Sequence, residues 1–222
     1  MEKRRLIFGT YDTAAKGWTL ASWRLAAAVQ KTTYVDKPSG DGTWDLSTAL
    51  TDGLARYNDR TLTATFECSE GDRMTREALI REMVNQLDGF RLDIELPDDP
   101  EHYVNGRLHV KKDYNDLAHG AVTVTATCEP WKYAKAEKVI TLDAVTAEQD
   151  ATLTNAGRRA TVPVLTVEGS GASVRLVYGT ASKSMSVGTY QWPTLLLTPG
   201  DHKVTFSGKG RLVVRYREAV LE

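Results

Sequence analysis

The sequence predicts a mainly β protein made of two domains, and three patterns lead to this expectation. Apolar and polar residues alternate with a period of two over most segments, as they do in strands that bury only one face. One segment instead has its apolar residues three and four positions apart, which is the spacing of an amphipathic helix. Turn-forming glycine, proline, asparagine and aspartate residues separate short apolar segments in the second part of the chain.

Three segments of the first part show the alternation most clearly: Arg60–Cys68, Phe90–Leu96 and Ala121–Cys128. In the first of them the even-numbered positions from 62 onward are apolar, whereas positions 61, 63 and 65 are threonine. Sheets with one wet face are typically antiparallel. We therefore expect the first domain to be an antiparallel β-sandwich or a barrel-like structure.

The segment from Met74 to Leu87 predicts the helix of this domain. Asp72 or Thr75 is placed to cap its start, and Gly89 stands where a left-handed residue would end it. A lone helix among strands usually covers an open sheet face or packs on one end of a sandwich. The expected first domain is therefore a β structure with one α-helix against it.

The boundary between the domains is expected after Glu129–Tyr133, which gives an N-terminal domain of residues 1–135 and a C-terminal domain of residues 136–222. The second domain is again all-β. Its expected strands are Val139–Leu142, Pro163–Val167, Ser173–Tyr178, Leu195–Leu197, Lys203–Phe206 and Arg211–Tyr216. Its turn signals are Asn155–Gly157, Gly169–Gly171, Pro199–Asp201 and Gly208–Gly210. This regular spacing suggests a small β-sandwich or jelly roll.

The charge of the chain argues against several classes of binding protein. Of the 222 residues, 28 are Lys or Arg and 29 are Asp or Glu, for a net charge of -1. Split at residue 135, the first part has 18 basic and 21 acidic residues, and the second has 10 and 8. Neither part is a basic module for nucleic acid or an anionic membrane. No apolar run approaches the roughly 20 residues that span a bilayer, and the N-terminus does not resemble a signal peptide, so we expect a soluble protein made in a reducing cytoplasm.

No set of residues predicts catalysis, a bound cofactor or a metal ion. The four histidines are His102, His109, His119 and His202, and no two have the one-turn spacing of a metal-binding helix. The sequence also lacks a GxSxG elbow, a phosphate-binding P-loop and a GxGxxG motif after a strand. We expect the first three histidines to be surface residues.

Two acidic pairs, Asp98–Asp99 and Asp113 with Asp116, have the composition of a glycosidase site. Both lie in expected turns, where aspartate is favoured because its side chain bonds the local backbone. Cys68 and Cys128 lie on the apolar faces of their strands, without a CxxC pair or a Cys/His cluster. The sequence therefore predicts turn residues and buried, reduced thiols rather than chemistry.

Aromatic residues of the second domain pose a separate question, because exposed aromatic rings can stack on sugars. The candidates are Tyr178, Tyr190, Trp192 and Phe206. Trp192 precedes the apolar segment Leu195–Leu197, and Tyr178 ends an apolar strand. These positions favour packing in the core or at its rim.

A series of motifs in fixed order carries a resemblance to a known family. The motifs are Pro38–Ser47, Tyr57–Arg60 before a strand, the helix ending at Leu87–Gly89, Leu96–Pro100, Gly106–Arg107 and Glu129–Tyr133. In this order they resemble the N-terminal domain of distal tail proteins of long-tailed bacteriophages, although the family often has glycine at the position of Ser39. The segments Asn155–Gly157, Pro163 and Gly210–Tyr216 are similar to the galectin-like C-terminal β-sandwich of the same proteins.

The resemblance implies a structural, non-enzymatic protein of the virion. Such proteins form a six-fold ring at the tail tip, which joins the tail tube to tail-associated, baseplate or fibre proteins, and DNA passes through its lumen. The implied partners are further copies of this chain, a tail tube protein, a tail-tip protein and receptor-binding proteins. The resemblance implies no cofactor and no membrane insertion. A net charge near zero would not trap a passing polyanion.

Two other classes compete with the structural hub. A carbohydrate-binding module, which would attach the particle to a host cell wall, is the main alternative and requires an exposed aromatic platform beside polar residues. An enzyme is disfavoured because no acid–base pair, nucleophile or metal-ligand set converges in the sequence.

Overall fold

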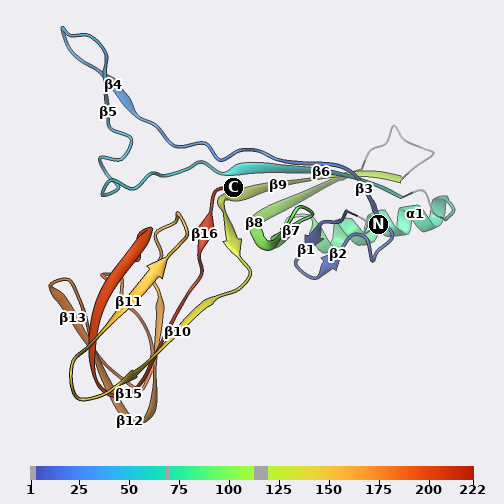
Figure 1. Ribbon diagram of the computed structural model, residues 1–222. Helices are drawn as coiled ribbons and strands as arrows, with labels where there is room; N and C mark the ends of the chain where they lie inside the picture. Colours follow the sequence, from blue (N-terminus) through green and yellow to red (C-terminus); the bar gives the residue numbers. More distant parts are fainter. Residues whose placement is uncertain (1–3, 69–70, 113–119) are drawn as a thin grey trace. The chain divides into compact units, whose positions relative to one another are not determined.

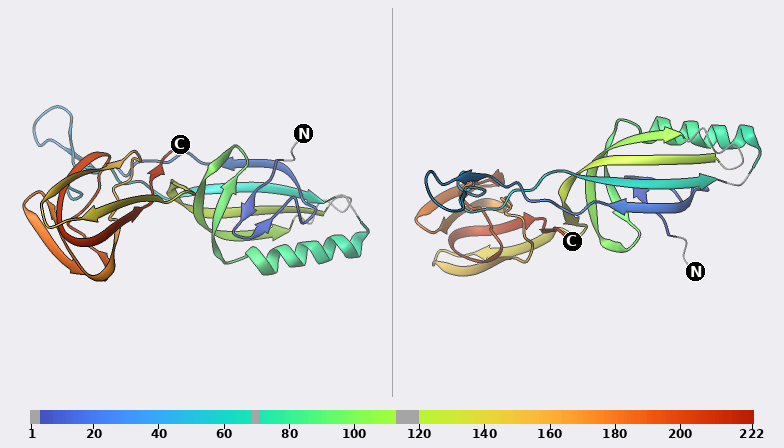
Figure 2. Two further views of the ribbon diagram at one scale, coloured as in Figure 1. Left: turned by 60° about the horizontal axis from the view of Figure 1, so that its bottom comes forward. Right: turned by 90° about the horizontal axis from the view of Figure 1, so that it is seen from above.

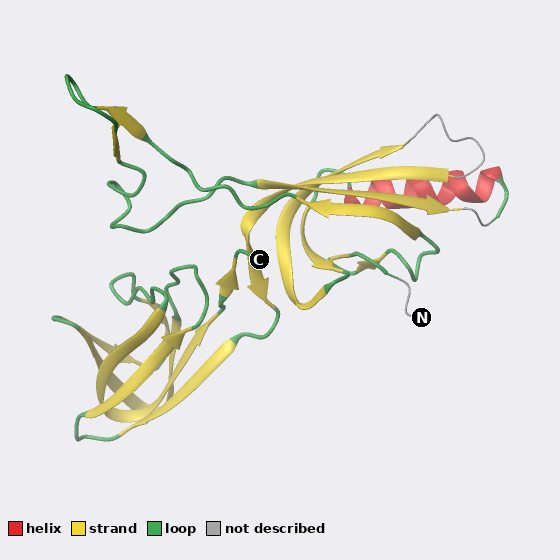
Figure 3. Cartoon of the chain, turned by 45° about the horizontal axis from the view of Figure 1, so that its top comes forward, coloured by secondary structure: helices red, strands yellow, loops and turns green. Residues whose placement is uncertain are grey.

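The structure is a computed structural model that describes residues 4–68, 71–112 and 120–222. Within these ranges the protein is mainly β, with antiparallel sheets and one α-helix, as Figure 3 shows. The predicted fold class is confirmed. No described helix is long and apolar enough to cross a lipid bilayer.

The chain folds into two compact units, each with a hydrophobic core of its own. The first unit comprises Met1–Lys132 together with Leu221–Glu222, and the second comprises Tyr133–Val220. The division falls near the end of a long strand, β9 (Gly120–Ala134), and the last two residues of the chain belong with the first unit. Figure 1 shows the order of the elements along the chain.

The first unit is built on a curled sheet with the strand order β2-β1-β7-β8-β9-β6-β3. The short strand β16 (Ala219–Val220) of the second unit pairs with β9, which runs across the division between the units. Helix α1 runs along one side of the long strands of this sheet (Figure 2). The other elements of the unit are β1 (Ile7–Phe8), β2 (Tyr11–Asp12), β3 (Thr19–Leu25), β4 (Tyr34–Asp36), β5 (Thr43–Asp45), β6 (Arg60–Cys68), α1 (Arg73–Leu87), β7 (Arg91–Leu96) and β8 (Asp99–Lys112).

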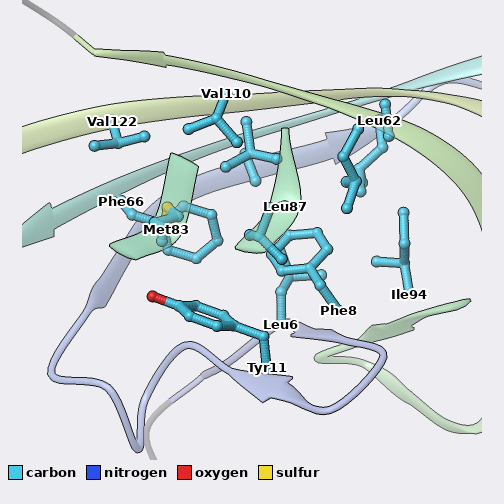
Figure 4. Packing of buried hydrophobic residues seen from close by; sticks show 14 of the residues in the cluster. Leu6, Phe8, Tyr11, Leu62, Phe66, Met83, Leu87, Ile94, Val110 and Val122 are labelled. Carbon is cyan, nitrogen blue, oxygen red and sulfur yellow. The ribbon is translucent and has the colours of Figure 1, made fainter. Parts of the chain in front are cut away.

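The core of the first unit lies between the long strands on one side and α1 with β1 and β7 on the other (Figure 4). Met83 and Leu87 of α1 are fully buried in the same cluster as Leu62 and Phe66 of β6. Phe66 also meets Phe8 edge to face, with ring centroids 6.1 Å apart. The alternating apolar residues of β6 and the three-and-four spacing of α1 thus point into one shared core.

Helix α1 begins and ends where the sequence places its caps. It starts at Arg73, and the Asp72 carboxylate accepts a hydrogen bond from the backbone N–H of Thr75 at 2.8 Å. The N–H of Asp88 donates to the carbonyl oxygen of Val84, and Gly89 follows with a left-handed φ of 79°. Asp72 rather than Thr75 is therefore the N-cap.

The strands of the first unit largely follow their predicted bounds. Strand β6 matches the prediction residue for residue, whereas β7 begins at Arg91 and leaves Phe90 outside it and exposed. Strand β9 is longer than expected, because it includes the segment Glu129–Tyr133, after which the domain boundary is expected. The positive φ of Ser39, 59°, explains why glycine suits this position, since a side chain is strained there.

The second unit is a six-stranded curled sheet with the order β10-β15-β12-β13, in which β11 also pairs with β15 and β14 with β12. Its core contains fully buried aliphatic residues from both long strands, including Leu165, Leu176 and Leu212. Its strands are β10 (Lys138–Ala144), β11 (Gln149–Asn155), β12 (Val164–Tyr178), β13 (Ala181–Ser186), β14 (Gly188–Gln191) and β15 (Gly200–Tyr216).

Two of the turns predicted for this unit are not turns in the structure. The segments Gly169–Gly171 and Gly208–Gly210 lie inside the continuous strands β12 and β15. Residues 169–172 of β12 stand opposite Gly210 alone, so the register shifts there by a bulge. The glycines therefore bend two long strands at the same place, where the sequence pattern suggested four short strands.

The segment Leu195–Leu197 is also not a strand. Leu197 forms only an isolated bridge with Thr161, and each donates its backbone N–H to the carbonyl oxygen of the other. Leu195 and Leu197 are nevertheless fully buried. Two of the three leucines therefore lie in the core, as predicted, whereas the predicted strand is wrong.

Candidate assembly surfaces

A long two-stranded arm, residues 26–59, leaves the first unit between β3 and β6 (Figure 1). At its base the N–H of Ala26 donates to the carbonyl oxygen of Thr61 at 2.8 Å, and farther out the N–H of Asn58 donates to that of Val29 at 2.9 Å. Strands β4 and β5 continue the pairing toward the glycine-rich turn. No residue between positions 26 and 59 is buried, so the arm contributes nothing to either core.

The arm carries an unusual share of exposed apolar surface. Eleven large hydrophobic side chains are exposed among the described residues, and six of them lie on the arm: Val29, Tyr34, Val35, Trp44, Leu46 and Leu50. An isolated two-stranded hairpin is marginally stable in water, and contiguous exposed apolar residues mark contact surfaces. The arm therefore has the physical character of an element that another molecule covers.

The base of the arm is fixed to the first unit by aromatic packing. The ring of Tyr57 meets the ring of Trp131 edge to face, with centroids 5.3 Å apart. Both residues belong to motifs that carry the family resemblance, the segments Tyr57–Arg60 and Glu129–Tyr133. Their contact gives these two motifs a shared structural role, which is to hold the returning side of the arm against β9.

Strand β3 forms an open edge of the first unit's sheet. It pairs with β6 on one side, and no strand of the described residues pairs with its other side. The hydrogen bond from Ala26 to Thr61 and the alternation of antiparallel pairs direct the backbone groups of Ser22 and Arg24 toward β6. Those of Trp23 and Leu25 consequently face outward and can pair with a strand from another molecule.

The wet face of the same sheet presents paired threonines. Thr61, Thr63 and Thr65 of β6 stand directly opposite three threonines of β9, which are Thr127, Thr125 and Thr123 in that order. We refer to these six residues as the threonine face. On the opposite side of β6, Ser22 of β3 faces Thr65 and Arg24 faces Thr63, so the face continues toward the open edge.

Four of the residues singled out from the sequence, Asp98, Asp99, His102 and His109, form local ion pairs or hydrogen bonds. Asp99 is the first residue of β8 rather than a turn residue, and its carboxylate contacts His102 Nδ1 at 2.8 Å and Lys132 Nζ at 3.1 Å. Burial raises the pKa of Asp99, but the hydrogen bonds from His102 and Lys132 outweigh this effect and lower it overall. Asp98 stays in the turn before β8, 3.8 Å from an Arg4 nitrogen.

The other acidic residues and histidines considered from the sequence also do not form a shared site within the described residues. His109 is exposed and contacts the Asp88 carboxylate at 2.9 Å, while Asp113, Asp116 and His119 lie outside the described residues. Nowhere in residues 4–68, 71–112 and 120–222 do three or more His, Cys, Asp or Glu side chains gather in a way that could hold a metal ion.

Both cysteines are buried, as their strand positions predicted. Burial raises the pKa of the Cys128 thiol to about 11, so the nucleophilic thiolate is scarce at neutral pH. A Cβ atom on Gly106 would lie 2.6 Å from Cys128 Sγ. The glycine of the Gly106–Arg107 motif therefore makes room for this thiol.

The aromatic residues of the second unit are mostly part of its core. Trp192 and Phe206 are buried, and Tyr178 donates or accepts a hydrogen bond with His202 Nδ1 at 2.8 Å. The Nε2 atom of His202 lies 2.7 Å from the carbonyl oxygen of Thr198, so this histidine is a buried, fully engaged residue that the sequence pattern did not reveal. Tyr190 is half-buried, so these residues form no open stacking platform.

Comparison with known proteins identifies the fold. No protein-family model matches the chain, and no curated protein matches it. The chain matches the structure of the SPP1 Dit (gp 19.1) protein, described as a paradigm of the hub adsorption apparatus in phages that infect Gram-positive bacteria. The TM-score is 0.67 at 15% identity, over 97% of this chain and 98% of that chain. This chain therefore has the fold of that protein across both units.

Two structures of the phage P2 baseplate in its activated conformation also match, one with calcium and one with strontium. The calcium structure gives a TM-score of 0.44 at 8% identity, over 98% of both chains. The strontium structure gives 0.43 at 7% identity, over 95% of this chain and 97% of that one. These two similarities are too low to carry an argument about this chain.

Proposed function

We propose that this chain is a structural component of the tail tip of a long-tailed phage or a prophage-derived particle. It forms a ring-shaped hub that joins the tail tube to the baseplate or fibre proteins and leaves a lumen for DNA. The observation that carries this proposal is the likeness to the SPP1 hub protein over nearly the whole length of both chains. The uncovered arm and the open edge of β3 support it, because both need a partner molecule.

The arm and the edge also favour a closed ring. They lie on one chain and differ from each other, so a contact between copies joins unlike surfaces head to tail. Head-to-tail contacts produce closed rings when the rotation between neighbours closes, and closure protects sheet edges from runaway pairing. We propose six copies of the chain in this ring.

The proposed partners follow from the position of such a ring in a particle. A tail tube protein meets one rim, and tail-associated and receptor-binding proteins meet the other rim or the periphery. The role is structural rather than enzymatic, since the described candidate residues form ion pairs and core contacts instead of a convergent site. The protein is made in the host cytoplasm and ends in the virion.

The experiment that tests the ring is a measurement of native mass for the full chain by light scattering, up to millimolar concentration. Six copies of the 24.5 kDa chain give a particle of about 147 kDa. The double variant Trp44→Ser, Leu46→Ser should shift the distribution toward the monomer and leave the melting temperature of the monomer unchanged, because both side chains are exposed.

A matched control removes exposed apolar side chains elsewhere. The double variant Val139→Ser, Val187→Ser changes two exposed residues of the second unit and should assemble as the parent chain does. A chain that stays monomeric over the whole concentration range contradicts the proposed ring. If the arm variant assembled as well as the parent chain, the arm would not form part of the contact between copies.

A further inference from the structure

We infer that Arg60 is a binding site for a carboxylate group on an extended segment of a partner protein, and that residues 221–222 of the same chain keep this site closed. The inference takes from the proposed function only that other proteins dock on this chain. Arg60 is the first residue of β6, and it belongs to the same compact unit as Leu221 and Glu222.

The guanidinium group of Arg60 is buried but only partly hydrogen-bonded. Its side chain is 1% exposed, and its Nη1 donates to the carbonyl oxygen of Leu221 at 3.0 Å. The Nε and Nη2 atoms are also buried, and they have no hydrogen-bond partner within the described part of the chain. A buried donor without an acceptor has lost its hydration without compensation. The site is therefore incomplete in the isolated chain.

The two unpaired nitrogens identify the chemistry of the missing group. Nε and Nη2 lie on the same edge of the planar guanidinium, and their N–H bonds on this edge are parallel. The two oxygens of a carboxylate accept both bonds at once, whereas one carbonyl oxygen such as that of Leu221 cannot fill the edge. Phosphate oxygens have a similar spacing, but the proposed partners are proteins, so we assign the edge to an Asp or Glu side chain.

The charges near Arg60 in this chain do not complete the site. Glu222 Oε1 lies 3.8 Å from Nη1, the nitrogen that is already bonded, and the Glu222 side chain is 74% exposed, so this ion pair is weak. Cys128 stands opposite Arg60 in the pairing of β6 with β9, and its thiol is neutral at pH 7 because burial raises its pKa to about 11. Burial lowers the pKa of Arg60, yet an arginine stays charged at neutral pH. The buried charge thus has only an exposed carboxylate as its counter-charge.

The cover over the site can open without disturbing the rest of the fold. Leu221 is half-buried and Glu222 is exposed, and both follow β16 outside regular structure. The preceding residue pair is held independently of Arg60, since the Ala219 carbonyl oxygen accepts a hydrogen bond from the N–H of Arg158 at 2.8 Å. Local opening of such a terminal segment costs much less free energy than global unfolding. Residues 221–222 therefore act as a displaceable occupant of the Arg60 site.

The first test measures how accessible the Arg60 guanidinium is in the full chain. Phenylglyoxal modifies accessible guanidinium groups, and mass spectrometry of the digested protein gives the rate at each arginine. In the parent chain Arg60 should react at least about tenfold more slowly than Arg24, which is exposed. The double variant Leu221→Gly, Glu222→Gly makes closing entropically costlier and should speed the reaction of Arg60 at least about fivefold, with Arg24 unchanged. An unchanged Arg60 rate would show that residues 221–222 do not close the site and would overturn the inference.

The second test measures binding of a carboxylate by titration calorimetry at millimolar ligand. The probe is a pentapeptide with blocked ends and the sequence TVEVT, and its control is TVQVT, which has the same shape without the charge. The double glycine variant should bind TVEVT at least about tenfold more tightly than TVQVT. The parent chain should bind TVEVT about fivefold more weakly than this variant does, because residues 221–222 compete for the site. Inorganic phosphate should bind the variant more weakly than TVEVT.

Substitutions at Arg60 and at a control arginine assign the binding to one residue. Arg60→Met, added to the double glycine variant, should abolish the preference for TVEVT, whereas Arg24→Met should keep it. Arg60→Lys retains the charge without the paired donors and should lose most of the preference, which covers the case that the methionine variant fails to fold.

The outcomes separate this inference from the proposed function. Equal binding of the two peptides, or a preference that survives Arg60→Met, overturns the carboxylate site. Tighter binding of phosphate than of TVEVT overturns the assignment to a carboxylate. A chain that forms a ring but shows no peptide preference contradicts only this inference, and a chain that prefers TVEVT but stays monomeric contradicts only the ring.

Discussion

Gly210 of β15 packs so closely on Ala172 of β12 that a Cβ atom at Gly210 would lie 2.4 Å from the Cβ of Ala172. The φ of Gly210 is 111°, a conformation that side chains other than hydrogen rarely allow. The contact lies at the bulge where residues 169–172 stand opposite Gly210 alone. Two neighbouring strands therefore bend together at a point that only glycine can occupy.

Replacing Gly210 with alanine should destabilise the second unit by about 3 kcal/mol or more, since both backbone strain and overpacking act at this site. Gly179→Ala is the matched control: its φ of 58° is also left-handed, but nothing lies within 4 Å of its Cβ position. The control should cost only about 1 kcal/mol of backbone strain. Urea unfolding of both variants measures the difference in unfolding free energy. Equal losses of stability would show that the close contact between Gly210 and Ala172 does not determine the cost.

These glycines also show what the sequence could and could not predict about the fold. Period-two alternation correctly predicted β6 and its buried face, because a half-buried strand must alternate. The clusters Gly169–Gly171 and Gly208–Gly210 have the composition of turns, although they bend continuous strands. A positive φ is needed in both situations, and only the pairing of β12 with β15 distinguishes them.

Stability should fall at high pH through Cys128. Burial raises the pKa of its thiol from 9.0 to about 11, so the native state holds the proton more tightly than the unfolded chain does. Its contribution to stability is complete below pH 9 and is lost as the pH rises toward 11. The loss is at most roughly 3 kcal/mol by proton linkage.

The measurement compares urea unfolding of the parent and of Cys128→Ala at pH 8 and pH 10.5. The variant should be less stable at pH 8, because a buried side chain is removed, and should lose less stability as the pH rises. Tyr11, whose pKa burial raises to about 12, is present in both proteins and cancels in the comparison. If the unfolding free energies of the two proteins changed equally with pH, this would contradict a raised pKa of the Cys128 thiol.

The second unit should bind sugars weakly or not at all, and Trp192 should act through stability. Trp192 is buried in the same core as Leu195 and Leu197. Trp192→Ala should therefore cost about 3 to 5 kcal/mol of unfolding free energy. Val187→Ala, at an exposed position, should cost less than about 0.5 kcal/mol. Saturable glycan binding by the parent that disappears in a fully stable Trp192→Ala protein would support the carbohydrate-binding alternative instead.

The candidate assembly surfaces were only partly visible in the sequence. The Pro38–Ser47 segment was correctly interpreted as a glycine-rich turn within a hairpin, and β4 and β5 pair across it. Its uncovered state could not be predicted, because Tyr34 and Trp44 are residue types that usually signal a core. The threonines at positions 61, 63 and 65 were assigned to the wet face, but their pairing with threonines of β9 depends on a register that the sequence does not reveal.

We predict that residues 1–135 assemble into a ring without residues 136–222. The arm, the open edge of β3 and the threonine face all lie within this segment. One obstacle is Arg60, whose side chain is 1% exposed and whose Nη1 donates to the carbonyl oxygen of Leu221 at 3.0 Å. Its Nε and Nη2 atoms are buried and have no hydrogen-bond partner among the described residues. A fragment ending at residue 135 removes Leu221 and leaves a buried charge without this acceptor.

The fragment should therefore be made in two forms, with Arg60 retained and with Arg60→Met. Methionine fills a similar volume without the charge, so the Arg60→Met fragment should melt at a higher temperature than the parent fragment. Light scattering up to millimolar concentration then measures assembly of both forms, with residues 136–222 as the control that should stay monomeric. A ring formed by the Arg60→Met fragment would confirm that the first unit carries assembly. If this fragment folds but stays monomeric while the full chain forms a ring, the second unit must supply part of the contact, because loss of the Arg60 partner can no longer explain the failure.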